Sequence, residues 1–400
     1  MTPAQQTTVM SPAELRREFL LDPDITFLNH GSFGSCPRPV FDVYQGWQRE
    51  LERQPVEFLG RRYHRLLGEV RETLGAFLGC APDEVVLCDN ATTGVNVIVR
   101  SLDLNAGDEV LTTDHEYGAC ELTWRYLSEQ HGVRVVKAEV DLPIARGEDV
   151  VEAIWSRVTP RTKVLYLSHI TSVSALRLPV EELCRRAREA GIFSLIDGAH
   201  VPGHLPIDLA AIGADAYTGN LHKWLCAPKG AAFLHVRPEH HPWVMAPIVS
   251  WGWSDEAHHH SVNQLTSRNE WQGTRDPAAW LTVPAAIAYL ADRGWDAVRA
   301  RCRETVRGVR TAIAELGGLA PIAPDEPWWQ LQFVACPVPV TDGKATQARL
   351  WDDHRIEVPF TCWRGRWHVR VSIQGYNDQS DVERLLEALR DEVHTASMAT

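Results

Sequence analysis

The chain has 400 residues, of which 44% are hydrophobic and 23% charged, and this composition excludes a disordered or fibrous protein. At roughly 100–200 residues per domain, the length accommodates two or three domains with their own cores. The formal net charge of −12 excludes the basic surface that nucleic acid requires. No apolar run approaches the roughly 20 residues of a membrane span. Nine cysteines without a C-x-x-C pair indicate reduced thiols in a cytoplasmic protein.

The first part of the chain is predicted to be helical, and an alternating pattern follows it. A capping box at Ser11–Glu14 opens a short amphipathic helix, and further helices are expected over 39–53 and 63–78. Strands buried on both faces and separated by crossover helices form parallel sheets, so the next part predicts a largely parallel α/β sheet. The expected strands are 85–88, 109–112, 133–138, 163–168, 192–196 and 231–236, and the expected helices are 117–130, 150–158 and 180–190.

The pattern changes again after about residue 280 and predicts a smaller α+β domain. Its expected elements are helices over 283–290 and 295–316, a strand near 330–335, a helix near 346–354, a strand over 369–373 and a helix over 381–393. The predicted organisation is an N-terminal arm over 1–25, a large α/β domain over 26–280 and a small domain over 281–400. Active sites of open α/β sheets lie at the carboxyl ends of strands, so polar residues there are the first candidates.

Two strand ends carry the clearest chemical signature. Asp197 ends an apolar strand and begins Asp-Gly-Ala-His, while Lys223, one of only five lysines, stands in His-Lys-Trp after the next short strand. A lysine amine forms a Schiff base with pyridoxal phosphate, and a carboxylate holds the pyridine nitrogen protonated so that the ring accepts electrons. A helix N-cap is the alternative role for Asp197, and a surface position is the alternative for Lys223. The two motifs in succession favour a pyridoxal-phosphate enzyme.

These residues belong to an ordered series of eight motifs between about Phe27 and Asn377. The motifs are Asn29–Gly34, Asn90–Gly94, Thr113–Gly118, Ser168–Ser172, Asp197–His200, Asn220–Trp224, Gly273–Asp276 and Val369–Ser372. In this order they resemble fold-type I pyridoxal-phosphate enzymes of the class V aminotransferase family, which includes cysteine desulfurases, and within it isopenicillin N epimerase-like proteins. The resemblance implies a large domain with a mainly parallel seven-stranded sheet, a smaller α+β domain, and a homodimer with a shared active site.

Phosphate contacts are expected at a strand-to-helix turn. Ala91, Thr92 and Thr93 follow a strand and open an expected helix, whose free N–H groups and hydroxyls suit a phosphate. A simple Thr-Gly turn is the alternative. The resemblance adds phosphate contacts from three further residues, of which the last reaches in from a second subunit: Asn220, His222 and Thr274.

The resemblance also implies contacts to the cofactor ring. Tyr117 matches the position of a ring stacked on the cofactor face and is expected to be catalytic with Lys223 and Asp197, and His115 is its rival as the stacking residue. Ser172 and His200 match positions that hydrogen-bond the ring hydroxyl. Desulfurases usually have Asn and Gln at these two positions, so the sequence departs from them here.

Substrate contacts are expected from both ends of the chain. Arg370 matches the family's arginine for the substrate α-carboxylate, where a guanidinium makes a two-pronged, charge-assisted contact. Asn29 and His30 match an N-terminal substrate loop, with a turn as the alternative, and Arg275 is a further substrate candidate. The three consecutive histidines at 258–260 are interpreted as a solvated loop and not as a metal site.

The cofactor does not choose the reaction, and several functions stay open. Epimerisation or racemisation at an amino-acid α-carbon is named first, and it needs a second acid or base opposite Lys223. C–S β-elimination is the alternative. A persulfide-forming desulfurase is disfavoured because Cys362 lies eight residues before Arg370, nearer than that pattern places it. Transamination and a non-catalytic binding module complete the set, and a binding module would tend to lose Lys223 or Asp197.

Overall fold

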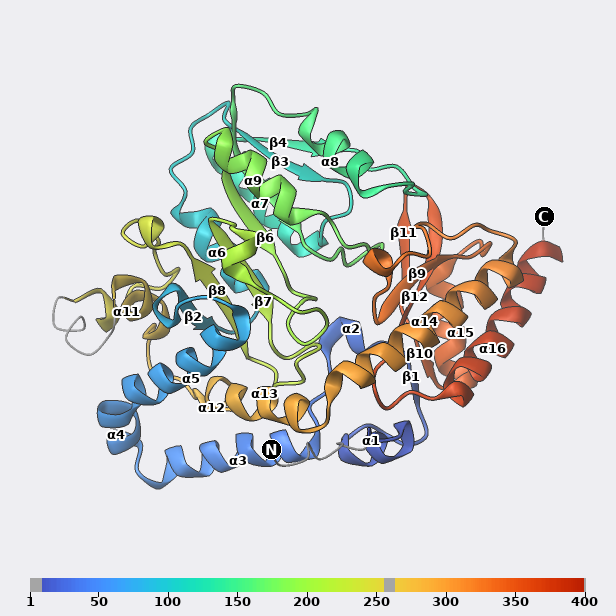
Figure 1. Ribbon diagram of the computed structural model, residues 1–400, viewed down its shortest axis with the longest axis horizontal. Coiled ribbons are helices and arrows are strands. Elements are labelled where there is room, and N and C mark those ends of the chain that lie inside the picture. The colour runs from blue at the N-terminus through green and yellow to red at the C-terminus, as the bar shows by residue number, and fades with distance from the viewer. Residues whose placement is uncertain (1–8, 255–262, 399–400) are drawn as a thin grey trace, which may run out of the picture.

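A seven-stranded sheet forms the centre of the protein in the computed structural model, which describes residues 9–254 and 263–398 (Figure 1). The strand order is β2-β8-β7-β6-β5-β3-β4, and all neighbours are parallel except that β8 runs antiparallel to β2 and β7. The strands are β2 (Val85–Cys88), β3 (Glu109–Thr113), β4 (Arg134–Ala138), β5 (Thr162–Ser168), β6 (Phe193–Asp197), β7 (Ala216–Asn220) and β8 (Ala232–Val236). The predicted fold, a mainly parallel seven-stranded α/β sheet, is confirmed.

Helices cover both faces of this sheet because its side chains alternate between two apolar cores. Val110, Tyr166 and Leu195 pack in one core with residues of α6 (Ala91–Ser101) and α7 (Gly118–His131). Leu111, Leu165 and Ile196 point to the other face and pack with the helices on that side. The helices that contribute to this second core include α5 (Tyr63–Leu78), α8 (Gly147–Trp155), α9 (Val180–Glu189) and α10 (Leu209–Ile212). The strand ends that carry polar residues therefore open between two covered faces.

The N-terminal helices follow the predicted boundaries within a few residues. Ser11 caps α1 (Pro12–Glu18) through the predicted box, in which Ser11 Oγ accepts from the Glu14 N–H and Glu14 accepts from the Ser11 N–H. The other elements before β2 are α2 (His30–Phe33), α3 (Arg38–Arg53), α4 (Pro55–Glu57), the π-helix η1 (Phe58–Arg62) and the 3-10 helix η2 (Pro82–Glu84). Helix α5 keeps its predicted limits.

A three-stranded antiparallel sheet, in the order β11-β12-β9, forms the centre of the C-terminal part. Its strands are β9 (Phe333–Pro337), β11 (Phe360–Trp363) and β12 (Arg366–Ser372), and its helices are α14 (Trp295–Gly317), α15 (Gly343–His354) and α16 (Gln379–Met398). An N-terminal strand, β1 (Thr26–Phe27), pairs in parallel with β10 (Ile356–Glu357) of this part. The first residues of the expected large domain therefore pack with the small one.

The connection between the two parts consists of short helices. It includes the 3-10 helices η3 (Pro238–His240) and η4 (Trp251–Trp253), then α11 (Gln264–Glu270), α12 (Ala278–Leu281) and α13 (Val283–Asp292), and η6 (Pro327–Trp329) follows α14. Helix α13 contacts α3 and α5 of the large part, whereas α14 contacts β9 and α16 of the small part. We propose that the domain boundary lies near Gly294, between α13 and α14, and not at residue 281. Among the described residues, no helix is long and apolar enough to cross a membrane.

Candidate active site

A cavity of about 610 Å³ opens at the carboxyl ends of the central strands. Its walls come from residues after β2, β3, β5, β6 and β7, as expected for an open α/β sheet. This volume lies within the range of about 300–1,000 Å³ that is typical of small-molecule sites. The lining residues that the sequence predicted are Ala91, Thr92, Thr93, Tyr117, Ser172, Asp197, His200, Asn220, His222 and Lys223.

Asp197 is held at the end of β6 with its carboxylate buried. Its Oδ1 accepts from the Ala199 N–H at 2.9 Å, and the Tyr166 hydroxyl donates to Oδ2 at 3.4 Å. Burial raises the pKa of Asp197, which means that a cationic partner in the cavity is favourable for its charged form. The carboxylate is therefore preorganised to face a cation such as a protonated pyridine nitrogen.

Lys223 reaches the same cavity from the loop after β7. Its Nζ lies 3.2 Å from His200 Nε2. Burial, followed by the positive charge of Arg370, lowers the pKa of Lys223 to about 7. Burial likewise lowers the pKa of His200 well below its usual range, so that ring is neutral. An amine that loses its proton near neutral pH is a competent nucleophile and a competent proton carrier.

The N-terminus of α6 forms the phosphate-binding side of the cavity. Asn90 caps the helix by accepting the Thr93 N–H at 2.8 Å, and Asn220 Oδ1 accepts the Ala91 N–H at 2.9 Å. The positive end of the helix dipole therefore meets the cavity, as an anion requires. The expected helix at this position is confirmed in place of the Thr-Gly turn. His222 lines the same wall, and burial lowers its pKa to about 4.

Arg370 lies buried where the small sheet meets the large part. It does not itself line the described cavity, but it contacts two residues that do. One of its amino groups donates to the Ser172 carbonyl at 2.7 Å and to Ser172 Oγ at 3.0 Å, and the other donates to Ser32 Oγ at 2.7 Å. Burial lowers the pKa of Arg370 to about 10. Ser32 lines the cavity beside this guanidinium, and no role was predicted for it from the sequence. Its position in the Asn29–Gly34 motif was the available signal.

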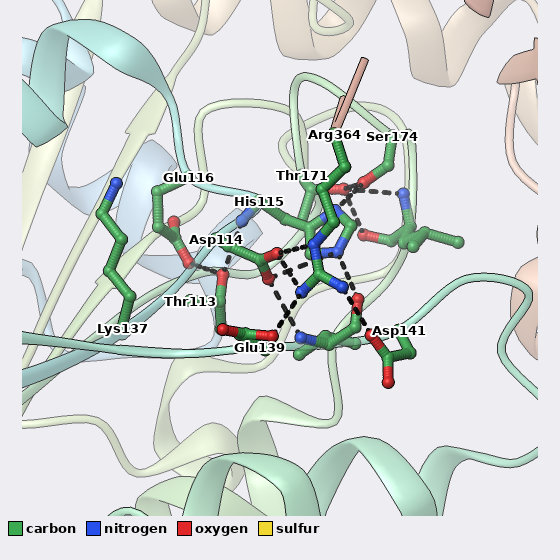
Figure 2. Close-up of polar contacts among 12 residues, drawn as sticks. Thr113, Asp114, His115, Glu116, Lys137, Glu139, Asp141, Thr171, Ser174 and Arg364 are labelled. Atoms are coloured by element: carbon green, nitrogen blue, oxygen red, sulfur yellow. Dashed lines mark hydrogen bonds and ion pairs between the residues drawn. The ribbon is translucent and has the colours of Figure 1, made fainter. Parts of the chain in front are cut away.

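Tyr117 lies on the cavity wall, but His115 does not. Tyr117 is 44% exposed at the start of α7 and lines the cavity. His115 is buried instead beneath Trp363, with the two rings stacked 4.9 Å apart, and it hydrogen-bonds Ser174 and the Val140 carbonyl (Figure 2). The loop therefore turns the His115 side chain toward the small sheet, and this placement favours Tyr117 over His115 as the stacking residue.

Asn29 and His30 also lie outside the cavity, where they hydrogen-bond to residues that line it. The Asn29 amide donates to Glu357 at 2.9 Å and accepts from Ser32 Oγ, which in turn faces Arg370. His30 is fully buried between the Tyr376 hydroxyl at 2.9 Å and the Lys223 carbonyl at 3.0 Å. In this structure both residues make supporting contacts, and their direct contact with substrate stays a prediction.

Gly34, the last residue of the Asn29–Gly34 motif, is required by the backbone at this position. Gly34 has φ +67°, and a side chain there would collide with the carbonyl of His222. The N-terminal loop can therefore lie directly on the segment that carries Lys223 only with glycine at this position. Lys229 also lines the cavity and donates to the Gly34 carbonyl at 2.9 Å, and no role was predicted for it from the sequence.

Thr274 and Arg275 do not line the cavity. Arg275 pairs with Asp89, which lines the cavity, and lies over the Trp280 ring at 4.0 Å. Its contact with substrate stays a prediction. Thr274 is exposed on the surface. The histidines at 258–260 lie outside the described residues.

A buried carboxyl next to Asp197 is not used by the predicted site. Glu116 accepts from the Ser168 N–H at 2.8 Å and from the Ser168 hydroxyl at 2.6 Å. The Thr113 hydroxyl also donates to it at 2.6 Å (Figure 2). Burial raises its pKa to about 7, so the folded protein favours the protonated acid. Its stabilising contribution is complete below the unfolded-state value of 4.5 and is lost as the pH rises through about 7.

Replacing Glu116 with glutamine should therefore change how stability depends on pH. The amide carries no charge. Its oxygen can still accept from Ser168, and its NH₂ group donates to the Thr113 hydroxyl, as the protonated acid would. Relative to the parent, Glu116→Gln should gain on the order of 3 kcal/mol of unfolding free energy between about pH 5 and pH 8, measured by urea denaturation. A flat Glu116→Gln difference over this pH range would contradict the assignment.

The residues of the cavity fit pyridoxal phosphate. A buried amine, a buried carboxylate and a helix N-terminus line one space of suitable volume, and these meet the aldehyde, the pyridine nitrogen and the phosphate of that cofactor. The fold and the site together define a pyridoxal-phosphate-dependent enzyme of fold type I.

Comparison with known proteins gives the family. The Aminotransferase class-V profile matches residues 36–385, and the chain belongs to that family. It is 37% identical to the isopenicillin N epimerase of Amycolatopsis lactamdurans, over 95% of this chain and 98% of that protein. It is 30% identical to putative L-cysteine desulfhydrase 1 of Oryza sativa subsp. japonica, over 95% and 86%. The apo cysteine desulfurase of Thermococcus onnurineus NA1 shares the fold, with a TM-score of 0.82, 20% identity, and 97% and 100% coverage.

Proposed function

We propose that this protein is an epimerase that inverts the α-carbon of an amino-acid substrate of the isopenicillin N type. One observation carries the proposal: the Lys223 amine, with a pKa of about 7, lies in one cavity with Asp197. Such an amine can take a proton from a carbon acid and return it at neutral pH. The 37% identity to an isopenicillin N epimerase over nearly the whole chain supports the choice of reaction.

Each residue then has a separate task. Arg370, held by Ser32 and Ser172, binds the substrate α-carboxylate, and Lys223 moves the proton at the α-carbon. Asp197 holds a proton on the pyridine nitrogen, and the first turn of α6 with Asn220 and His222 binds the phosphate. When bound, the cofactor supplies an electron sink for the carbon–hydrogen bond that breaks.

Tyr117 can serve as the stacking ring, as a second proton carrier, or as both. Tyr117→Phe keeps the ring and loses the hydroxyl, whereas Tyr117→Ala loses both. If stacking is its role, Tyr117→Ala should raise the cofactor Kd about tenfold and Tyr117→Phe should leave it within about twofold. A Tyr117→Phe enzyme that binds cofactor normally but no longer interconverts the stereoisomers would assign the second proton to the hydroxyl. Fluorescence titration of the cofactor and chiral chromatography measure the two effects.

C–S β-elimination is the second candidate because a desulfhydrase relative matches 95% of the chain. A persulfide route is disfavoured by geometry: Cys362 is exposed on β11 and does not line the described cavity. Transamination would use the same residues and remains a further alternative.

The deciding experiment is incubation of the purified holoenzyme in D₂O. Isopenicillin N should acquire deuterium at its aminoadipyl α-carbon and yield both stereoisomers, which NMR and chiral chromatography detect. The same preparation given L-cysteine should release little sulfide or pyruvate. Release of sulfide without deuterium exchange would replace the epimerase proposal with the lyase.

We propose further that the enzyme is a cytoplasmic homodimer with a shared active site. An exposed apolar stretch supports a second copy as the partner: Ile248, Val249, Trp251 and Trp253 are 48–73% exposed. Thr274 is exposed within the same connecting region, in keeping with a contact to the partner's phosphate site.

A further inference from the structure

The tip of the β11–β12 hairpin has an unfavourable residue for its turn. Arg364 and Gly365 link the two strands with φ angles of +45° and +76°. Two-residue hairpin turns with positive φ at both positions favour Asn and Gly, and an arginine there is strained. The strain is offset only if the side chain gains something that Asn or Gly lacks.

The Arg364 guanidinium makes hydrogen bonds and ion pairs with three carboxylates of the large domain. Its Nε and one amino group donate to Asp114 Oδ2 at 3.0 and 2.7 Å (Figure 2). The other amino group donates to Asp141 at 2.6 Å, and Glu139 lies within 3.3 Å. Asp114 is itself fixed, because its Oδ1 accepts the Val140 N–H at 3.0 Å.

The neighbouring residues extend this contact toward the active site. Trp363 is buried against the ring of His115, and the Thr361 hydroxyl donates to the Val173 carbonyl at 2.9 Å. The hairpin therefore docks on two large-domain segments, 113–117 and 171–175. These segments carry Tyr117 and Ser172, which line the cavity.

The docked hairpin and the substrate arginine share one strand. β12 runs from the turn to Arg370, whose guanidinium contacts Ser172 in the second docked segment. A rigid strand transmits any shift of the tip to the position of Arg370. Within the small domain, the contact described for the Arg364 guanidinium is its position over the Trp363 ring, 4.5 Å from the ring centre. Its hydrogen bonds go to the large domain.

We propose that Arg364 is a positioning residue that docks the small domain and so sets the place of Arg370 for the substrate carboxylate. The inference rests on the proposed function, since it takes Arg370 as the carboxylate site. It predicts that Arg364 affects ligands with an α-carboxylate and spares those without one.

The test uses L-alanine and ethylamine, which differ only in the α-carboxylate, as ligands of the holoenzyme. Their affinities are measured from the absorbance change of the bound cofactor. Arg364→Asn, which suits the turn, should weaken L-alanine binding about fivefold or more and leave ethylamine unchanged. Asp114→Asn should cause a similar loss, and the double variant should lose no more than either single variant.

Two further variants separate the possible failures. Arg349→Asn removes an ion pair with Glu392 inside the small domain and should leave the affinity for both ligands unchanged. Arg370→Ala should abolish the preference for L-alanine over ethylamine, and if it does not, the proposed carboxylate site is wrong. If Arg370→Ala behaves as expected while Arg364→Asn leaves L-alanine unchanged, or weakens both ligands equally, the positioning role is overturned.

Discussion

Replacing Lys223 with alanine should abolish covalent attachment of pyridoxal phosphate and lower turnover by at least about 10³-fold. The expected loss is large because one amine both holds the cofactor and moves the substrate proton. Its surroundings support this double role: burial lowers its pKa to about 7, and Asp197 shares its cavity. Borohydride reduction followed by intact mass analysis measures the attachment directly.

Lys229 provides a matched control, because it is a second lysine on the same cavity wall. Its Nζ is engaged with the Gly34 carbonyl at 2.9 Å. Lys229→Ala should therefore keep the borohydride-dependent mass increase. If the increase persists in Lys223→Ala and disappears in Lys229→Ala, the assignment of the Schiff-base lysine is reversed.

The sequence predicted the cavity well where function depends on strand ends. Asp197 and Asn220 are the last residues of β6 and β7, and Lys223 follows at once, so locating the strands also located the side chains. The first turn of α6 was predicted for the same reason, since Ala91, Thr92 and Thr93 follow a strand, and the structure shows that Asn90 caps this helix. Hydrophobic periodicity and helix capping depend on residues close together in the chain, so the local sequence is enough to predict them.

The sequence does not decide positions at which side chains from distant segments compete for one place. His115 and Tyr117 stand two residues apart, and only the docked Trp363, nearly 250 positions later, shows which of them faces the cavity. His30 hydrogen-bonds both the Lys223 carbonyl and the hydroxyl of Tyr376, which comes from the opposite end of the chain. The two-residue strands β1 and β10 pair only with each other, and neither carries enough periodicity to be seen alone.

The second large effect is expected at the buried carboxylate. Asp197→Asn keeps the shape and the Ala199 N–H contact but removes the charge that holds a proton on the pyridine nitrogen. Turnover should fall about 10²–10³-fold, in the range seen when one preorganised electrostatic contact is lost. The covalent link to Lys223 should persist, which separates this defect from that of Lys223→Ala.

Asp215→Asn is the matched control for this substitution. Asp215 is also a buried aspartate of the central sheet, but it lies just before β7 begins, where it accepts from the Ser194 N–H at 2.8 Å. Its loss should lower the midpoint of thermal unfolding and leave turnover of the folded holoenzyme within about twofold, because it lies far along the strands from the cavity. Equal losses of turnover in the two variants would mean that Asp197 acts through folding stability and not through the pyridine nitrogen.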